Sequence, residues 1–230
     1  SSRTIIFDHQ YSIQAISQID LTQYFPHTGW VEHSPDEIWQ STVKTAQQAM
    51  RKNDIDASQV ASLGITNQRE TTIIWNKRTG KPIYNAIVWQ DRRTSNYCDT
   101  LKNQGLEKTI TEKTGLLLDP YFSASKIVWI LDNVDGAMSA AKNGELAFGN
   151  VDSWLIWNLT SDRKHLTDIT NASRTMLFNI VHQDWDYELL NIFGIPDSML
   201  PEVKDCGYEF GQTNPSLFLG PISICGVAGD

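Results

Sequence analysis

The chain has 230 residues, and 19 basic against 27 acidic side chains give it a formal net charge of −8. Its hydrophobic content of 40% is enough for one large domain, or two small ones, without disulfide staples. No run of basic residues occurs, so neither nucleic acid nor an anionic membrane is an expected partner.

The cysteines and the apolar runs indicate a cytoplasmic protein. Cys98, Cys206 and Cys225 are too few and too widely spaced for a disulfide framework or a zinc site, so reduced thiols are expected. The histidines show no metal-ligand spacing, and no metal site is expected within this chain. No apolar run approaches the roughly 20 residues that span a bilayer, and no signal peptide is recognisable.

The first third of the chain predicts strands around one long helix. Residues 4–8 are β-branched and aromatic, and residues 11–21 alternate between apolar and polar, which favours two strands paired through a tight turn. Ser34 can cap a helix, since a proline and two acids follow it, and apolar spacing carries this helix to about Lys52. Residues 60–66 predict the next strand.

The rest of the chain mixes strands and helices. Two apolar stretches flank the turn at residues 78–82 and predict a hairpin over residues 72–89. Helices are expected within residues 93–144, with breaks at three glycines, then at residues 151–159, capped by Asp152, and near residues 187–193. An apolar strand at residues 221–230 ends in a Gly-Asp turn. We therefore expect one domain with a mixed α/β sheet flanked by helices.

The most informative stretch is Ser62-Leu-Gly-Ile-Thr-Asn-Gln-Arg-Glu-Thr71, in which a predicted core strand stops abruptly at polar residues. Binding groups in open α/β sheets gather beyond the carboxyl ends of strands. The Arg69 guanidinium can donate and the Glu70 carboxylate can accept, so the pair suits a polyhydroxylated ligand. A surface ion pair, which contributes only about 0–1 kcal/mol, is the alternative.

Three further residues are candidates for the same site. Trp89 could lie against the carbon backbone of a ligand, or could be a core tryptophan. Tyr121 precedes a predicted helix and its hydroxyl could bind a ligand, or it could be an ordinary helix-entry tyrosine. Asp230 could accept a substrate proton from its turn, or it could be a turn or capping aspartate. Residues 168–175 are rich in side chains that bond the backbone and are interpreted as loop scaffolding. Spacing alone predicts an α/β domain with a possible polyol site.

Several stretches together resemble the FGGY family of carbohydrate kinases, and within it the enzymes that act on glycerol. They are Ser1-Ser-Arg3, Gly29-Trp-Val-Glu-His33, Gly64-Ile-Thr-Asn-Gln-Arg-Glu-Thr71, Gly80-Lys-Pro-Ile-Tyr-Asn-Ala-Ile-Val-Trp-Gln90, Asp119-Pro-Tyr-Phe-Ser123, Thr167-Asp-Ile-Thr-Asn-Ala-Ser-Arg-Thr-Met-Leu-Phe-Asn179 and Gly226-Val-Ala-Gly-Asp230. The matches are ordered and cover the whole chain. The resemblance implies an actin/hexokinase-like, ribonuclease-H-type fold and transfer of a phosphoryl group from ATP, with Mg²⁺, to glycerol.

The resemblance also implies roles for individual residues. Arg69, Glu70 and Tyr121 would bind the glycerol hydroxyls, and Trp89 would pack on its carbons. Asp230 would be the general base that takes the proton of the terminal hydroxyl. Two residues at the start of the chain, Ser1 and Arg3, would contact the nucleotide phosphates.

The chain departs from the pattern of the family at both ends. The first strand with its phosphate-binding turn and the whole second domain, which holds most of the ATP or ADP, have no counterpart here, so an inactive N-terminal fragment is expected. Two strands would then lack a neighbour, which invites association or marginal stability. Members of the family often form homo-oligomers. The alternatives are a non-catalytic polyol-binding module and a family kinase for another sugar or polyol.

Overall fold

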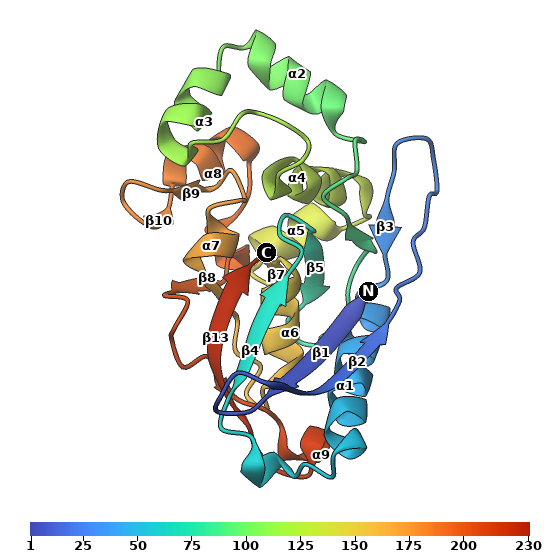
Figure 1. Ribbon diagram of the computed structural model, residues 1–230. Helices are drawn as coiled ribbons and strands as arrows, with labels where there is room; N and C mark the ends of the chain where they lie inside the picture. Colours follow the sequence, from blue (N-terminus) through green and yellow to red (C-terminus); the bar gives the residue numbers. More distant parts are fainter.

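The computed structural model describes residues 1–230, and its strands and helices form one mixed α/β arrangement (Figure 1). The strands are β1 Ser2–Phe7, β2 Ile13–Ile19, β3 Glu32–His33, β4 Leu63–Asn67, β5 Ile73–Asn76, β6 Ala86–Ile87, β7 Leu146–Gly149, β8 Leu166–Asp168, β9 Phe178–Asn179, β10 Asp184–Trp185, β11 Glu202–Lys204, β12 Gly211–Gln212 and β13 Ser223–Gly229. The helices are α1 Pro35–Lys52, α2 Ser95–Asn103, α3 Glu107–Thr114, α4 Ser123–Asn133, α5 Ala137–Lys142, α6 Val151–Leu159, α7 Ile169–Ala172, α8 Tyr187–Phe193 and α9 Pro215–Phe218, with 3₁₀ turns η1 Ala57–Gln59 and η2 Asp197–Met199.

The predicted first hairpin and long helix are both present. Strands β1 and β2 pair antiparallel, and α1 packs against them. The Ser34 hydroxyl accepts a hydrogen bond from the Glu37 backbone amide at 3.2 Å, which makes it the N-cap of α1, as predicted. Hydroxyl groups join the helix to the hairpin, for example Thr4 to Thr45 at 2.9 Å.

Strand β4 lies beside β13, and this pairing decides where the candidate residues meet. The two strands are parallel, and Gly229 is in register with Asn67. Their carboxyl ends therefore lie at the same edge of the sheet (Figure 1). Strand β12 pairs with the other edge of β13, whereas β4 and β1 each have a strand partner along one edge only.

The hairpin predicted at residues 72–89 is present, since Thr72 and Ile87 exchange backbone hydrogen bonds at its open end, but its two arms also have other strand partners. The Gly80 amide donates to the Asn76 carbonyl at 2.8 Å, and the Ile83 amide donates to the Ile74 carbonyl at 3.0 Å. The main partner of β5, however, is β7, and β6 pairs with β3. Strand β5 is therefore paired along both edges, with β7 on one and with the returning arm of the hairpin on the other, which sequence alternation cannot reveal.

The helices follow the predicted order, but the predicted cap of α6 is wrong. Asn150 is the N-cap residue, and its side-chain amide donates to the Thr71 carbonyl at 3.1 Å. Asp152 lies inside the first turn, fully buried, and its Oδ2 accepts from the Thr167 hydroxyl at 2.6 Å. Burial raises the pKa of Asp152 to about 7. The helix has the predicted bounds, but Asp152 is its second residue rather than its cap, and the side chain is enclosed in the core.

Two apolar clusters form the core. One fills the space among α2, α3, α4, α5 and α8, and the other surrounds Trp75, Trp154 and Trp157 between α6, β4 and β13. Trp75 contacts both other indoles edge-on, with ring centroids 5.3 and 5.6 Å apart. None of the helices combines the length and apolar character that crossing a bilayer requires.

Candidate functional site

The parallel pairing of β4 and β13 brings three of the predicted residues to one place. Arg69 and Glu70 follow the end of β4 within three residues, and Asp230 follows β13 directly. The Asp230 amide donates to the Asn67 carbonyl at 3.2 Å, which continues the ladder to the last residue. The site is thus built at the carboxyl end of two parallel strands, where the sequence predicted it.

Arg69 and Asp230 face each other without closing into a hydrogen bond. Arg69 Nε lies 3.6 Å from Asp230 Oδ1, and the two side chains are 30% and 65% exposed. The Arg69 Nε–H is itself buried and donates to no group of the chain. A β-carbon on Gly229 would lie 2.2 Å from Arg69 Cδ, so the glycine makes room for the guanidinium. The pair retains hydrogen-bonding capacity for a ligand.

Glu70 occupies a strained turn. Its φ is 61°, a left-handed conformation that is uncommon for a residue with a side chain. The Thr71 amide donates across it to the Arg69 carbonyl at 2.6 Å, which closes a three-residue γ-turn. The Ser123 hydroxyl donates to the Glu70 carbonyl at 3.2 Å and ties this turn to the start of α4. Strain of this kind concentrates at functional sites.

The Glu70 carboxylate is buried and paired with a residue that the sequence analysis left among loop scaffolding. Arg174 Nε donates to Glu70 Oε1 at 2.6 Å, and Glu70 Oε2 accepts no hydrogen bond within the chain. Burial raises the pKa of Glu70, and the hydrogen bond from Arg174 opposes that shift. One oxygen is therefore held in place while the other remains free to accept from a hydroxyl.

The segment from residue 168 to 175 fixes Arg174 in position. Asp168 caps α7 and accepts from the Asn171 amide at 3.2 Å. The side-chain amides of Asn171 and Asn67 donate to each other at 3.2 and 2.9 Å, which fastens α7 to the end of β4. The Gly229 amide donates to the Thr170 hydroxyl at 2.7 Å, which fastens it to β13. The segment is scaffolding, as predicted, but it also delivers Arg174.

The two aromatic candidates form a wall next to these charges. The rings of Trp89 and Tyr121 lie with centroids 5.4 Å apart at 56°. The Arg174 guanidinium lies 5.9 Å from the Tyr121 ring and 4.9 Å from the Phe122 ring. Trp89 is half-buried and has an exposed neighbour, Gln90, so it lies at the boundary of the core. The Arg174 guanidinium thus links the Glu70 carboxylate to the aromatic residues next to Trp89.

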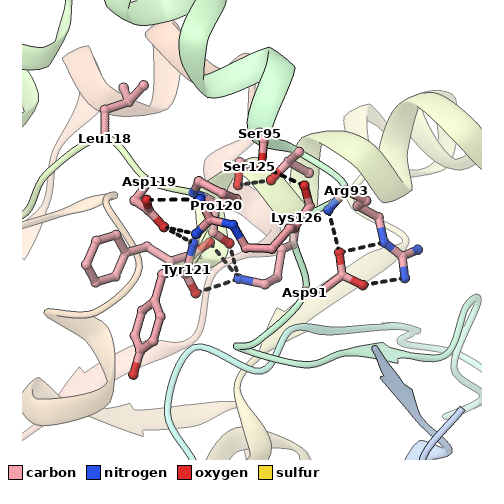
Figure 2. A network of polar contacts seen from close by, with 12 residues as sticks. Asp91, Arg93, Ser95, Leu118, Asp119, Pro120, Tyr121, Ser125 and Lys126 are labelled. Carbon is pink, nitrogen blue, oxygen red and sulfur yellow. Dashed lines mark hydrogen bonds and ion pairs between the residues drawn. The ribbon is translucent and has the colours of Figure 1, made fainter. Parts of the chain in front are cut away.

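The loop that follows Trp89 is held by a buried ion cluster. The Arg93 side chain is fully buried, and its guanidinium bonds Asp91 at 2.8 Å (Figure 2). A second ion pair joins it to Glu32 at 2.7 Å. The guanidinium also stacks on Trp30, 3.8 Å from the ring centroid. This cluster fixes the chain four residues beyond Trp89 and leaves no donor for a ligand.

The other predicted residues lie apart from this constellation. Arg3 Nε donates to the Gln18 side chain at 2.8 Å, and Gln18 donates to the Ser1 hydroxyl at 3.2 Å, all at exposed positions of β1 and β2. Neither contacts Arg69 or Asp230. No group of three or more His, Cys, Asp and Glu side chains is arranged to hold a metal ion.

Two surface hollows lie elsewhere on the molecule and share no residue with the site. One of about 270 Å³ is lined by Trp185 and Tyr187, and one of about 440 Å³ lies between Trp39 and Leu217.

Of the residues that shape the site, sequence reasoning missed Arg174 and the role of Ser123. The only signal for Arg174 in the sequence is that it is the one basic residue among residues 168–175.

Comparison with known proteins decides the family. The sequence model of the N-terminal domain of the FGGY family of carbohydrate kinases matches residues 1–230. The chain belongs to the FGGY family. It is 57% identical over its whole length to a glycerol kinase of Sinorhizobium fredii, of which it covers 46%. The chain therefore spans about half the length of the curated relatives it matches.

Solved structures give the same fold for this FGGY domain. A Plasmodium falciparum glycerol kinase with ADP superposes with a TM-score of 0.93 at 34% identity, over 99% of this chain and 46% of that one. A gluconate kinase from Lactobacillus acidophilus superposes with a TM-score of 0.89 at 21% identity, over 99% of this chain and 45% of that one, and shows the fold alone. The predicted actin-like fold is confirmed.

Proposed function

We propose that this FGGY domain binds glycerol and that the protein containing it phosphorylates glycerol at a terminal hydroxyl with ATP. The carrying observation is the constellation of two charge pairs and an aromatic wall, Arg69 with Asp230, Glu70 with Arg174, and Trp89 with Tyr121. The similarity to glycerol kinases over the whole chain supports the choice of substrate.

The constellation suits a small polyol. Water competes for every hydroxyl of glycerol, so a protein has to offer charge-assisted hydrogen bonds to order it. The unpaired Nε–H of Arg69 can donate, the unbonded Oε2 of Glu70 can accept, and the Tyr121 hydroxyl can do either. The Trp89 ring can cover the carbon side and exclude water.

Asp230 supplies the proton acceptor. Its carboxylate is accessible and makes no hydrogen bond within the chain, and Arg69 Nε approaches it only to 3.6 Å. Phosphoryl transfer to an alcohol requires an acceptor for the hydroxyl proton, and a positioned carboxylate contributes about 10²–10⁴-fold. We infer that Arg69 orients the Asp230 carboxylate toward the reacting hydroxyl.

ATP with Mg²⁺ would supply the phosphoryl group, and this chain holds only part of what they need. Within the candidate site only Asp230 has an accessible carboxylate, since Glu70 is bonded to Arg174. No cluster of three or more His, Cys, Asp and Glu side chains is arranged to hold a metal ion. Ser1 and Arg3 remain proposed phosphate contacts at exposed positions of the first hairpin. Transfer by this chain alone is therefore not expected. A cytoplasmic location and homo-oligomer formation remain proposals from the family.

A substrate test separates this proposal from its alternatives. The purified full-length gene product is assayed with ATP and glycerol, xylulose or gluconate, and calorimetry measures polyol binding without ATP. Turnover with glycerol at the highest kcat/KM supports the proposal. Preference for xylulose or gluconate would identify a kinase for another carbohydrate, and binding without turnover would identify a polyol-binding module.

A further inference from the structure

Lys126 lies where a positive charge is least expected. Its side chain is fully buried, and it is the fourth residue of α4, which begins at Ser123. The N-terminal end of a helix carries partial positive charge, and removing a cation from water is costly. Both effects oppose an ammonium group at this position, so a local partner has to compensate for them.

Three consecutive backbone carbonyls provide the compensation. Lys126 Nζ donates to the carbonyl oxygens of Pro120 at 2.7 Å, Tyr121 at 2.5 Å and Phe122 at 3.0 Å (Figure 2). An ammonium has three N–H donors, and all of them are used. A neutral amine has only two, and its lone pair would face the third carbonyl. The turn therefore fits the charged form of Lys126.

The same turn carries Tyr121 of the candidate site. Its backbone amide donates to Asp119 Oδ1 at 2.8 Å, and Arg92 holds Asp119 from outside at 2.7 Å. Figure 2 shows the Tyr121 ring directed away from this polar network, and its centroid lies 5.4 Å from that of Trp89. The direction of the ring is thus set by a backbone that Asp119 holds at the amide and Lys126 at the carbonyl.

We propose that Lys126 is a positioning residue for the polyol site, whose ammonium gathers the carbonyls of residues 120–122 and so fixes the Tyr121 ring beside Trp89. Lys126 does not touch the ligand, because its side chain is fully enclosed. This inference rests on the proposed function in one respect: Tyr121 is taken as a ligand of glycerol.

The charge of Lys126 is open to titration. Burial lowers the pKa of Lys126 to about 7, and the carboxylates around it, Asp91 after β6, Glu70 after β4 and Asp119 before α4, oppose that shift. Cys98 on α2 also faces it, but burial raises the pKa of that thiol to about 11, so it is neutral near pH 7. Only the charged form supplies three donors, so the turn is held at acidic pH and loosens as the pH rises through about 7. The KM for glycerol should therefore rise as the pH becomes alkaline.

The test measures KM and kcat for glycerol against pH in the full-length gene product. Lys126→Met should raise KM about tenfold below neutral pH, the effect of one weakened hydrogen bond to a ligand, with little change in kcat. It should also remove the alkaline rise of KM. Lys126→Gln keeps two donors, so a smaller rise in KM, independent of pH, is expected. Lys113→Met is the matched control, since Lys113 pairs with Asp186 outside the site.

Amide hydrogen exchange of residues 119–123 supplies a readout that needs no glycerol. Faster exchange there in the Lys126 variants, and a protection in the wild type that falls at alkaline pH, supports the inference even if the wild type ignores glycerol and the proposed function fails. The inference is wrong if the wild type uses glycerol and a folded Lys126 variant shows the wild-type KM, the wild-type pH profile of KM and the wild-type protection of residues 119–123. Should Lys126→Met not fold, Lys126→Gln and the wild-type protection profile decide.

Discussion

Two arginines of this chain lie beside carboxylates in opposite settings. The Arg93 side chain is fully buried and bonds Glu32 at 2.7 Å and Asp91 at 2.8 Å. The Arg69 side chain is 30% exposed and stops 3.6 Å short of Asp230, which is 65% exposed. Both arginines lie in loops that follow a strand and close to acidic residues, so composition alone does not distinguish them.

What distinguishes them is whether their hydrogen-bonding capacity is used up. Arg93 also donates to the Tyr84 hydroxyl at 3.4 Å and is covered by the rings of Trp30 and Trp129. A ligand could gain nothing there without breaking a bond that already exists. Arg69 has a buried Nε–H that donates to nothing. Incomplete pairing, rather than the presence of an ion pair, is what makes Arg69 a candidate for ligand binding.

Asp230→Asn probes the incomplete pair with the largest expected effect. Loss of the proton acceptor should lower kcat for glycerol by about 10²–10⁴-fold, whereas the KM should change little. Steady-state kinetics on the full-length gene product provide the measurement. Asp135→Asn, at an exposed helix boundary, is the matched control and should retain wild-type rates. Near-normal turnover of Asp230→Asn would rule out its role as the base.

Arg93→Met probes the complete cluster and should act on stability rather than on turnover. It leaves Glu32 and Asp91 buried without their cation, which costs about 3–5 kcal/mol of the free energy of unfolding. Urea unfolding followed by tryptophan fluorescence measures this loss. The control is Arg92→Met, which breaks a half-exposed pair with Asp119 and should cost about 0–1 kcal/mol. Equal losses in the two variants would contradict the comparison.

The sequence predicted the elements around the candidate site better than the contacts among its residues. Hydrophobic periodicity and caps placed α1 and α8 close to their observed bounds, because local spacing and capping chemistry decide both. The abrupt polarity after β4 and the final Gly-Asp turn placed Arg69 and Asp230 at one sheet edge. Parallel pairing then brought them together, and this pairing was not visible in either stretch alone.

What sequence could not predict depends on contacts between distant residues. Glu70 and Arg174 are 104 residues apart, and nothing near Arg174 indicates its partner. The pairing of β5 with β7 and the burial of the Asp152 side chain likewise depend on contacts with distant parts of the chain. Lys126 is one of several polar residues in the sequence of α4, and only the convergence of three carbonyls gives it a role.

Arg69→Ala sharpens the comparison at the level of binding. A charge-assisted hydrogen bond contributes about 1.5–3 kcal/mol, so KM for glycerol should rise about 10- to 100-fold. The free energy of unfolding should change by no more than about 1 kcal/mol, since the pair with Asp230 is long and exposed. Kinetics and urea unfolding on the same preparation check both values. Arg78→Ala, in an exposed turn, is the control and should alter neither.

Gly229→Ala tests the geometry of the incomplete pair with the smallest expected effect. The added methyl group would lie 2.2 Å from Arg69 Cδ, so the guanidinium has to leave its rotamer while keeping its charge. An off-rotamer side chain costs about 0.5–1.5 kcal/mol, so KM for glycerol should rise by less than about tenfold. Gly226→Ala on the same strand meets only the Cys206 carbonyl at 3.9 Å and is the matched control. If both alanines raise KM equally, the space beside Gly229 does not position the Arg69 guanidinium. The long distance between Arg69 and Asp230 would then have to arise from the exposure of Asp230.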